Sequence, residues 1–131
     1  LLISAAVESE IAAMDSQGDR ALFLADLGLK ESGLVRLTRS TYEALQQITY
    51  FTCGVQEVRA WTILKNSTAP RAAGVIHSDF EKNFIRAEII SYADFVQYGS
   101  EYACKERGRL FIQGRDYVMQ DGDIAYFRCS R

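Results

Sequence analysis

Residues 48–68 read ITYFTCGVQEVRAWTILKNST and contain two short segments of the same kind. Aromatic and β-branched residues fill 48–52, which is closed by Gly54, and 58–64 alternates in polarity up to the polar run 65–68. Short alternating segments bounded by turn-forming residues are typical of β-strands. This stretch therefore predicts a two-stranded hairpin.

The chain that follows the hairpin predicts further strands with helices between them. Residues 70–76 are small and compatible with a helix, and 84–90 has the composition of a strand. Residues 92–107 are long enough for one or two helices, which we expect to end at Gly108. Three more strands are expected in the tail, over 110–112, 117–119 and 124–129.

The last two of these strands are joined by Asp121-Gly122-Asp123. An Asp-Gly pair between alternating segments is a strong signal for a hairpin. Together the segments describe an α+β domain, in which helices pack against one face of a small mixed sheet. A ubiquitin-like β-grasp is one such layout, although the pattern alone does not select it.

The first 46 residues carry a mainly helical pattern. Residues 1–5 form a short apolar run that predicts a strand, and the segment after it lacks Gly and Pro up to Gly18, which predicts a helix. Asp19 is expected to cap a second helix that stops at Gly28. Ser32 is expected to start a third helix.

The third predicted helix has an apolar stripe. Its members follow one another at spacings of three and four residues: Leu34, Leu37, Thr41, Leu45 and Ile48. Such a stripe is expected to pack inward, while the opposite face with Arg36 and Arg39 meets water. The period changes from helical to two near residue 47, so we place a domain boundary between residues 46 and 47.

Length and composition exclude several classes of protein. The chain has 131 residues, of which 48% are apolar and 24% charged, and this profile excludes a disordered chain. No apolar run approaches the ~20 residues of a membrane span. The net charge of −2 divides into −3 over 1–46 and +1 over 47–131, so no overall field draws the chain to nucleic acid or lipid.

The N-terminus and the cysteines bear on the cellular compartment. The sequence begins without Met and without the basic start of a signal peptide, so we expect a non-secreted piece of a longer protein. Cys53, Cys104 and Cys129 are odd in number and widely spaced, which fits neither a disulfide framework nor a metal knuckle. We expect unpaired, reduced thiols, with Cys53 at a strand end the most exposed and oxidisable.

The common motifs for nucleotides and metals are absent from the sequence. A phosphate-binding loop requires GxxxxGK[ST], but Gly28 and Gly33, which have the right spacing, are followed by Leu34 and Val35 instead of the lysine. GxGxxG, GxSxG and HExxH are also missing, and a single histidine excludes a His-rich metal site. We therefore expect the chain to cradle no nucleotide phosphate and to bind no metal.

Three titratable side chains have both a catalytic and a structural interpretation. His77 is the single histidine, and its ring is expected to hydrogen-bond a turn or helix start capped by Ser78 or Asp79. The alternative is a Cys–His or His–Asp catalytic pair. Asp121 and Asp123 flank a glycine, which favours turn chemistry over an acid pair or a metal site.

Basic and aromatic side chains are candidates for contact with nucleic acid. Arg59 and Trp61 share one face of the predicted strand and could stack on a single-stranded base, although a lone Trp is more often part of a core. Further cations could form a phosphate-contacting patch, with His77 at its edge: Lys65, Arg71, Lys82, Arg86 and Arg115. Acidic residues are interleaved with them, so a mixed, solvated surface is the alternative.

Several long motifs carry a family resemblance over essentially the whole chain. They are the runs 48–52, 57–63, 69–81 (APRAAGVIHSDFE), 84–88 and 116–123 (DYVMQDGD), in this order. In these motifs the chain resembles the C-terminal part of the YchF family of Obg-like ATPases. Asn66 stands where the family has Gly after Lys, and the turn is expected to persist because Asn tolerates positive φ.

The resemblance implies two domains. Residues 47–131 would form a TGS domain of β-grasp fold, and residues 1–46 would be the end of a P-loop nucleotide-binding domain. Ser4, Ala5 and Ala6 match the family's last nucleotide motif, whose loop lies against the base. Because the P-loop lies upstream in the family, the resemblance implies no cofactor for this chain, and ATP or GTP with Mg²⁺ for the longer protein.

The resemblance also implies a role. A TGS module of a cytoplasmic, ATP-preferring NTPase is expected to dock on the ribosome or on RNA, while the upstream domain hydrolyses nucleotide. Its own nucleotide-binding domain is a further partner, whereas membrane binding and sequence-specific reading of DNA are not expected. The alternative is a structural or protein-interaction module, and this chain alone is expected to be inactive.

Overall fold

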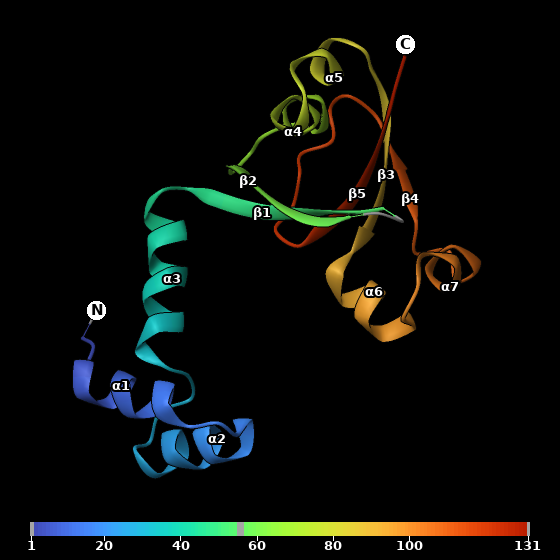
Figure 1. Ribbon diagram of the computed structural model, residues 1–131. Helices are drawn as coiled ribbons and strands as arrows, with labels where there is room; N and C mark the ends of the chain where they lie inside the picture. Colours follow the sequence, from blue (N-terminus) through green and yellow to red (C-terminus); the bar gives the residue numbers. More distant parts are fainter. Residues whose placement is uncertain (1, 55–56, 131) are drawn as a thin grey trace. The chain divides into compact units, whose positions relative to one another are not determined.

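The computed structural model describes residues 2–54 and 57–130. They form two compact units, Leu1–Leu45 and Gln46–Arg131, so the division lies one residue from the expected boundary. Among the described residues, the first unit contains three helices and the second a five-stranded sheet with four further helices (Figure 1).

Each helix of the first unit begins behind a serine. The helices are α1 (Ala5–Ala13), α2 (Gln17–Asp26) and α3 (Gly33–Ala44). Ser4 Oγ accepts a hydrogen bond from the Val7 N–H, Ser16 Oγ from the N–H groups of Gly18 and Asp19, and Ser32 Oγ from the Val35 N–H. Each hydroxyl thus satisfies donors that the first turn leaves unpaired.

Two predictions of secondary structure in this unit are wrong. Residues 2–4 form no strand and Ala5 already belongs to α1, because Ser4 caps a helix there; residue 1 of the predicted strand lies outside the described residues. The second helix is capped by Ser16 rather than Asp19, so it begins three residues earlier than expected. The stop at Gly28 is confirmed by its left-handed φ of 68°.

A carboxylate joins α1 to the start of α3. Glu8 accepts hydrogen bonds from the N–H groups of Gly33 at 2.6 Å and Leu34 at 3.2 Å. A negative charge is favourable there because the first N–H groups of a helix are unpaired and its N-terminus is electropositive. A larger residue at Gly33 would force neighbouring side chains to shift, since a Cβ at this position would lie 2.8 Å from Cγ2 of Ile3.

The apolar stripe of the third helix does not pack inward within its unit. Leu34, Leu37 and Leu45 are exposed, and Ile48 lies in the sheet of the second unit rather than in α3. On the polar side Arg39 is exposed, as expected, and forms a bidentate ion pair with Glu31, whereas Arg36 is half-buried. The helical period was therefore correct, but the surface that would cover the stripe is not provided by this unit.

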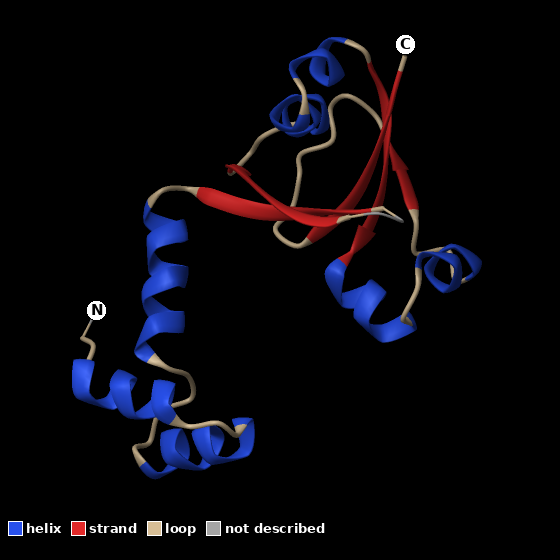
Figure 2. Ribbon diagram, in the orientation of Figure 1, coloured by secondary structure: helices blue, strands red, loops and turns tan. Residues whose placement is uncertain are grey.

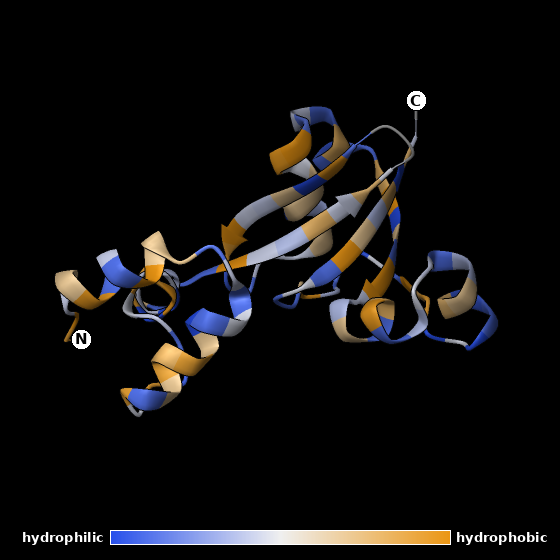
Figure 3. Ribbon diagram, turned by 60° about the horizontal axis from the view of Figure 1, so that its bottom comes forward, coloured by the Kyte–Doolittle hydropathy of each residue, from blue (hydrophilic) through white to orange (hydrophobic). Residues whose placement is uncertain are grey.

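The second unit is built on a mixed sheet (Figure 2). Its strands are β1 (Gln47–Cys53), β2 (Val58–Leu64), β3 (Phe84–Ser91), β4 (Phe111–Gln113) and β5 (Asp123–Cys129), in the order β2-β1-β5-β3-β4. β1 is antiparallel to β2 and parallel to β5, and β3 is antiparallel to β4 and β5. Hydrophilic and hydrophobic residues alternate along the strands (Figure 3).

Helix α4 (Ala69–Ile76) covers one face of this sheet, and α5 (Ser78–Lys82) packs against α4 (Figure 1). Ala69, Ala72 and Ala73 of α4 are fully buried, and their small side chains let the helix lie close to the strands. Tyr50 is buried beneath α4, and its hydroxyl donates to the Ala72 carbonyl at 2.9 Å. The core of the unit therefore lies between this helix and the sheet.

Several predictions for the second unit are confirmed. The hairpin, the helix over 70–76 and the strand over 84–90 are present, and 92–107 forms α6 (Tyr92–Tyr98) and α7 (Glu101–Glu106), which precede a left-handed Gly108. Asn66 has a φ of 66°, as expected for its turn.

The predicted strand over 117–119 and its hairpin with 124–129 are wrong. Val118 forms only an isolated bridge with Thr68, and β5 pairs with β1 and β3 instead. The turn residues bind β1: Asp121 Oδ1 accepts from the Thr49 N–H, and the Gly122 N–H donates to the Thr49 carbonyl. The Asp-Gly turn thus directs the chain into the centre of the sheet.

Candidate functional site

Three of the candidate cations lie in and beside the layer formed by α4 and α5. Lys65 is in the turn before α4, Arg71 is on α4, and Lys82 is the last residue of α5, and all three are exposed. None of them takes part in an ion pair within the described residues. We call these three residues the helix-layer cations, and their charges are available to an anionic partner.

His77 lies between α4 and α5 in the same layer. Its Nδ1 accepts a hydrogen bond from the Asp79 N–H at 3.3 Å and lies 3.6 Å from the Asp79 carboxylate. The ring itself therefore caps α5, in place of the predicted caps Ser78 or Asp79. These contacts give His77 the structural role that the sequence favoured, at an exposed position beside the helix-layer cations.

Arg59 and Trp61 form a stacked pair on β2. The guanidinium carbon of Arg59 lies 4.2 Å from the centroid of the Trp61 ring, and the indole N–H donates to Thr52 Oγ1 at 2.9 Å. Trp61 is partly buried and packs against the core. The ring is therefore held in place, with Arg59 covering one face of it, rather than presented bare to a base.

Arg86 lies on the other face of the sheet from the helix-layer cations. Ala87 and Ile89 are buried against α4, so the alternation along β3 places Arg86 on the opposite face of the sheet. A register shift between Phe84 and Arg86 lets Phe84 face the core as well. Arg115 donates to the Phe84 carbonyl at 2.8 Å. The predicted basic patch is thus divided between two faces of the sheet.

Arg128, the cross-strand partner of Arg86, was not among the cations predicted from the sequence. Both guanidinium groups donate to one carboxylate oxygen of Glu88, at 3.3 Å from Arg128 and 3.2 Å from Arg86. Burial by itself raises the pKa of Glu88, but these two hydrogen bonds outweigh it and hold the pKa below its usual value. The alternation in Tyr126-Phe127-Arg128 was the signal that places Arg128 on this face.

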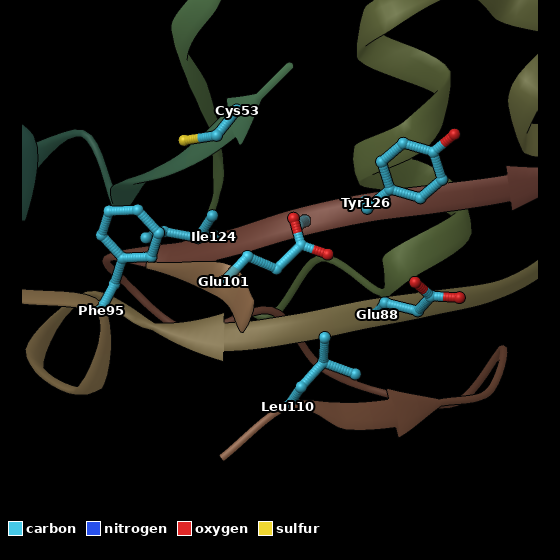
Figure 4. Close-up of a pocket in the computed structure, with 8 residues that line it drawn as sticks. Cys53, Glu88, Phe95, Glu101, Leu110, Ile124 and Tyr126 are labelled. Atoms are coloured by element: carbon cyan, nitrogen blue, oxygen red, sulfur yellow. The ribbon is translucent and has the colours of Figure 1, made fainter. Parts of the chain in front are cut away.

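A shallow pocket opens on the same face (Figure 4). It has a volume of about 30 Å³, and Cys53, Glu101 and Ile124 are among the residues that line it. Burial and the nearby charge of Glu101 raise the pKa of the Cys53 thiol. The pocket has room for a water molecule or two but not for a nucleotide, and it holds its thiol in the unreactive protonated form.

The remaining cysteines are also free thiols, and burial raises the pKa of each. Cys104 is buried, whereas Cys129 is half-buried in the same way as Cys53. Cys53 is therefore not distinguished by exposure, contrary to the expectation, because its strand end is covered by the residues of the pocket.

Asp121 and Asp123 make turn contacts rather than facing one another across a site. Asp123 Oδ2 accepts from the Tyr117 hydroxyl and the Gln120 N–H, both at 2.9 Å, while Asp121 accepts from β1. Within the described residues, no three His, Cys, Asp or Glu side chains gather as metal ligands would. Both carboxylates are accounted for by their structural hydrogen bonds.

The residues matched to a nucleotide motif lie at the start of α1. Ser4 is its N-cap, Ala5 and Ala6 open its first turn, and all three are exposed. Over the described part of the chain, no helix has the length and apolar character needed to cross a membrane.

The comparisons with known proteins agree with the motifs. Residues 47–130 match the family model YchF-GTPase_C, described as a protein of unknown function (DUF933). The chain belongs to this family. The resemblance to YchF proteins expected from the sequence is thereby confirmed, and the matched region covers every strand of the sheet.

The curated relatives of this chain are longer proteins. "Ribosome-binding ATPase YchF" of Haemophilus influenzae is 53% identical over 126 residues, 96% of this chain and 34% of the relative. The protein of the same name from Bacillus subtilis is 47% identical over 98% of this chain and 35% of its own length. "Obg-like ATPase 1" of Schizosaccharomyces pombe is 48% identical over 77% of this chain and 26% of its own length. The chain spans about a third of the length of the two ribosome-binding ATPases.

A solved structure shares the architecture. The YchF GTPase of Schizosaccharomyces pombe superposes with a TM-score of 0.78 at 41% identity, over 96% of this chain and 33% of that one. The mixed α+β architecture with its five-stranded sheet is therefore similar to that of a YchF structure.

Proposed function

We propose that residues 47–131 are a TGS domain of β-grasp type that docks on ribosomal RNA in the cytoplasm. Residues 1–46 would be the end of a P-loop nucleotide-binding domain, and hydrolysis would be carried out by the upstream part of the longer protein. The relatives named ribosome-binding ATPases support the partner. A mixed sheet with a helix packed across one face supports the fold.

The helix-layer cations carry this proposal. Lys65, Arg71 and Lys82 are exposed and lack ion pairs within the described residues. Because the whole chain has a net charge of −2, long-range attraction to RNA is weak and local phosphate contacts must supply the affinity. Arg59, His77 and Arg115 are secondary candidates, and Arg86 belongs to the opposite face, where Glu88 holds it.

Neutralising the helix-layer cations tests the proposal. We expect the K65Q/R71Q/K82Q variant to cosediment more weakly with ribosomes, because three phosphate contacts are lost. The slope of log affinity against log salt should flatten by up to ~3. Thermal stability should change little, since exposed charges contribute little to it.

The matched control removes the same number and kinds of charge elsewhere. Lys30, Arg36 and Lys105 are two lysines and one arginine outside the helix layer, and none forms an ion pair within the described residues. The K30Q/R36Q/K105Q variant should keep the parent's affinity and salt slope. Equal losses in both variants would point to net charge alone, and unchanged binding in the first would favour the protein-interaction module.

Nucleotide binding by this chain alone should be very weak. We propose that Ser4, Ala5 and Ala6 contact the base of ATP or GTP only when the longer protein supplies the phosphate site and Mg²⁺. Most of the affinity for a triphosphate comes from the phosphates and the metal ion. We expect calorimetry to give a dissociation constant for Mg-ATP weaker than about 1 mM. Micromolar binding would contradict this assignment.

The exposed leucines of α3 favour a second contact. Leu34, Leu37 and Leu45 form an apolar row that the first unit leaves uncovered. Apolar rows of this kind on a helix are normally buried against a neighbour. We propose that the rest of the nucleotide-binding domain covers them in the longer protein.

A further inference from the structure

Strand β2 forms one edge of the sheet and pairs only with β1 among the described residues. The Lys65 N–H donates to the Gln46 carbonyl and the Gly54 N–H donates to the Glu57 carbonyl. These two bonds mark hydrogen-bonded residue pairs at the two ends of the β1–β2 ladder. Between them the antiparallel alternation turns the backbone groups of Arg59, Trp61 and Ile63 toward β1. The N–H and C=O groups of alternate residues, Val58, Ala60 and Thr62, therefore point outward from the sheet.

This edge has little of the usual protection against pairing, since Arg59 is its single charged residue. The strand is seven residues long, its register with β1 is unbroken, and it contains neither proline nor lysine. In natural sheets an exposed edge strand is normally short, carries charged side chains or contains a β-bulge, and each of these features prevents pairing with another strand. The opposite edge follows that rule, since β4 has only three residues.

The side chains along β2 define what a paired strand would meet. On the face away from α4, Val58 is 72% and Leu64 is 53% exposed, with Ala60 and Thr62 between them. On the other face Arg59 lies exposed over Trp61. Its ion pair with Glu57 spans 3.9 Å between exposed groups, so it leaves the guanidinium available.

We propose that the β2 edge binds an extended segment of a partner protein whose residues alternate between apolar and acidic. The backbone of the segment would extend the sheet by one strand, its apolar side chains would continue the row of Val58, Ala60 and Leu64, and a carboxylate would face Arg59. This surface is separate from the helix-layer cations, and the inference stands independently of docking on RNA.

The direct test uses a capped seven-residue peptide of alternating valine and glutamate as the probe, with the 131-residue chain. Amide hydrogen exchange should slow at Ala60 and Thr62, whose N–H groups point outward, and remain unchanged at Trp61 and Ile63. The same peptide with lysine in place of glutamate should bind at least about tenfold more weakly, because Arg59 then meets a like charge. Binding without this alternating protection would overturn the proposal.

Two changes at the backbone separate edge pairing from simple attraction of charges. Thr62→Pro removes one outward N–H and leaves the ladder to β1 intact, so affinity for the glutamate peptide should fall at least about tenfold. N-methylation of alternate peptide amides should cause a similar loss with the unchanged protein, which keeps the test decisive if the proline variant fails to fold. Arg59→Glu should reverse the preference between the glutamate and lysine peptides.

Two outcomes would overturn the proposal. Equal affinity of the N-methylated and unmodified peptides would show that no strand is added to the sheet. Concentration-dependent dimerisation of the chain, abolished by Thr62→Pro and indifferent to the peptide, would assign the edge to a second copy of this chain instead of a partner.

Discussion

Replacing Tyr50 by alanine is expected to lower the free energy of unfolding by about 4 kcal/mol, the range found for large aromatic side chains removed from cores. Tyr50 is 0% exposed, its ring packs edge to face on Phe127 at 5.8 Å, and its hydroxyl donates to the Ala72 carbonyl. The substitution removes the contact that holds α4 on the sheet. Urea denaturation followed by circular dichroism measures the loss.

Two variants divide this loss into its parts. Tyr50→Phe keeps the ring and removes only the hydrogen bond, so it should cost about 1 kcal/mol. Tyr126→Ala removes a tyrosine from the opposite, half-exposed face and should cost less than about 1 kcal/mol. A loss of under about 1 kcal/mol for Tyr50→Ala itself would contradict the burial that places Tyr50 at the centre of the core.

Local pattern was enough to predict the strands β1, β2 and β3. Along β1 the buried residues Ile48 and Tyr50 alternate with half-buried ones, and this period is visible without knowing any partner strand. The segment 117–119 shows the limit of the same argument. Met119 is buried in the core and its N–H donates to the Ser67 carbonyl, so a partner far away in the sequence decided the path.

The candidate site was predictable as a set of residues but not as a surface. The sequence identified Lys65, Arg71 and Lys82, and the positions of the helices bring them into one layer. It could not separate Arg86 from them, because the register shift before Arg86 changes which face its side chain takes. Period-two arguments are reliable only between such irregularities, and a bulge leaves no mark in composition.

Arg128 was not predicted because its partner is known only from the pairing of distant strands. Its partner Glu88 is 40 residues away in the chain, and only the antiparallel pairing of β3 with β5 brings the two together. Charge pairs across strands follow from register, whereas pairs within a helix follow from spacing. The contacts among Arg86, Glu88 and Arg128 could therefore not be predicted from the sequence alone.

Asp123 is expected to be the second most sensitive position tested. Asp123→Ala should cost about 2–3 kcal/mol, because it leaves the Tyr117 hydroxyl and the Gln120 N–H without their common acceptor. Asp123→Asn keeps an oxygen at that place, so it should cost about 1 kcal/mol or less at neutral pH. Thermal and urea unfolding of the two variants beside the parent chain measure the difference.

The pH dependence distinguishes the charge of Asp123 from its hydrogen bonds. Burial raises the pKa of Asp123 even though the Gln120 N–H and the Tyr117 hydroxyl favour its ionised form. The folded state therefore holds this proton more tightly than the unfolded state, and the contribution of Asp123 to stability falls as pH rises through its unfolded and then its folded pKa. Asparagine does not titrate. The loss in free energy of unfolding caused by Asp123→Asn, relative to the parent, should therefore be largest at acidic pH and become smaller toward neutral pH. A difference that stays constant with pH, or an asparagine variant as unstable as the alanine one, would show that the carboxylate is not held as described.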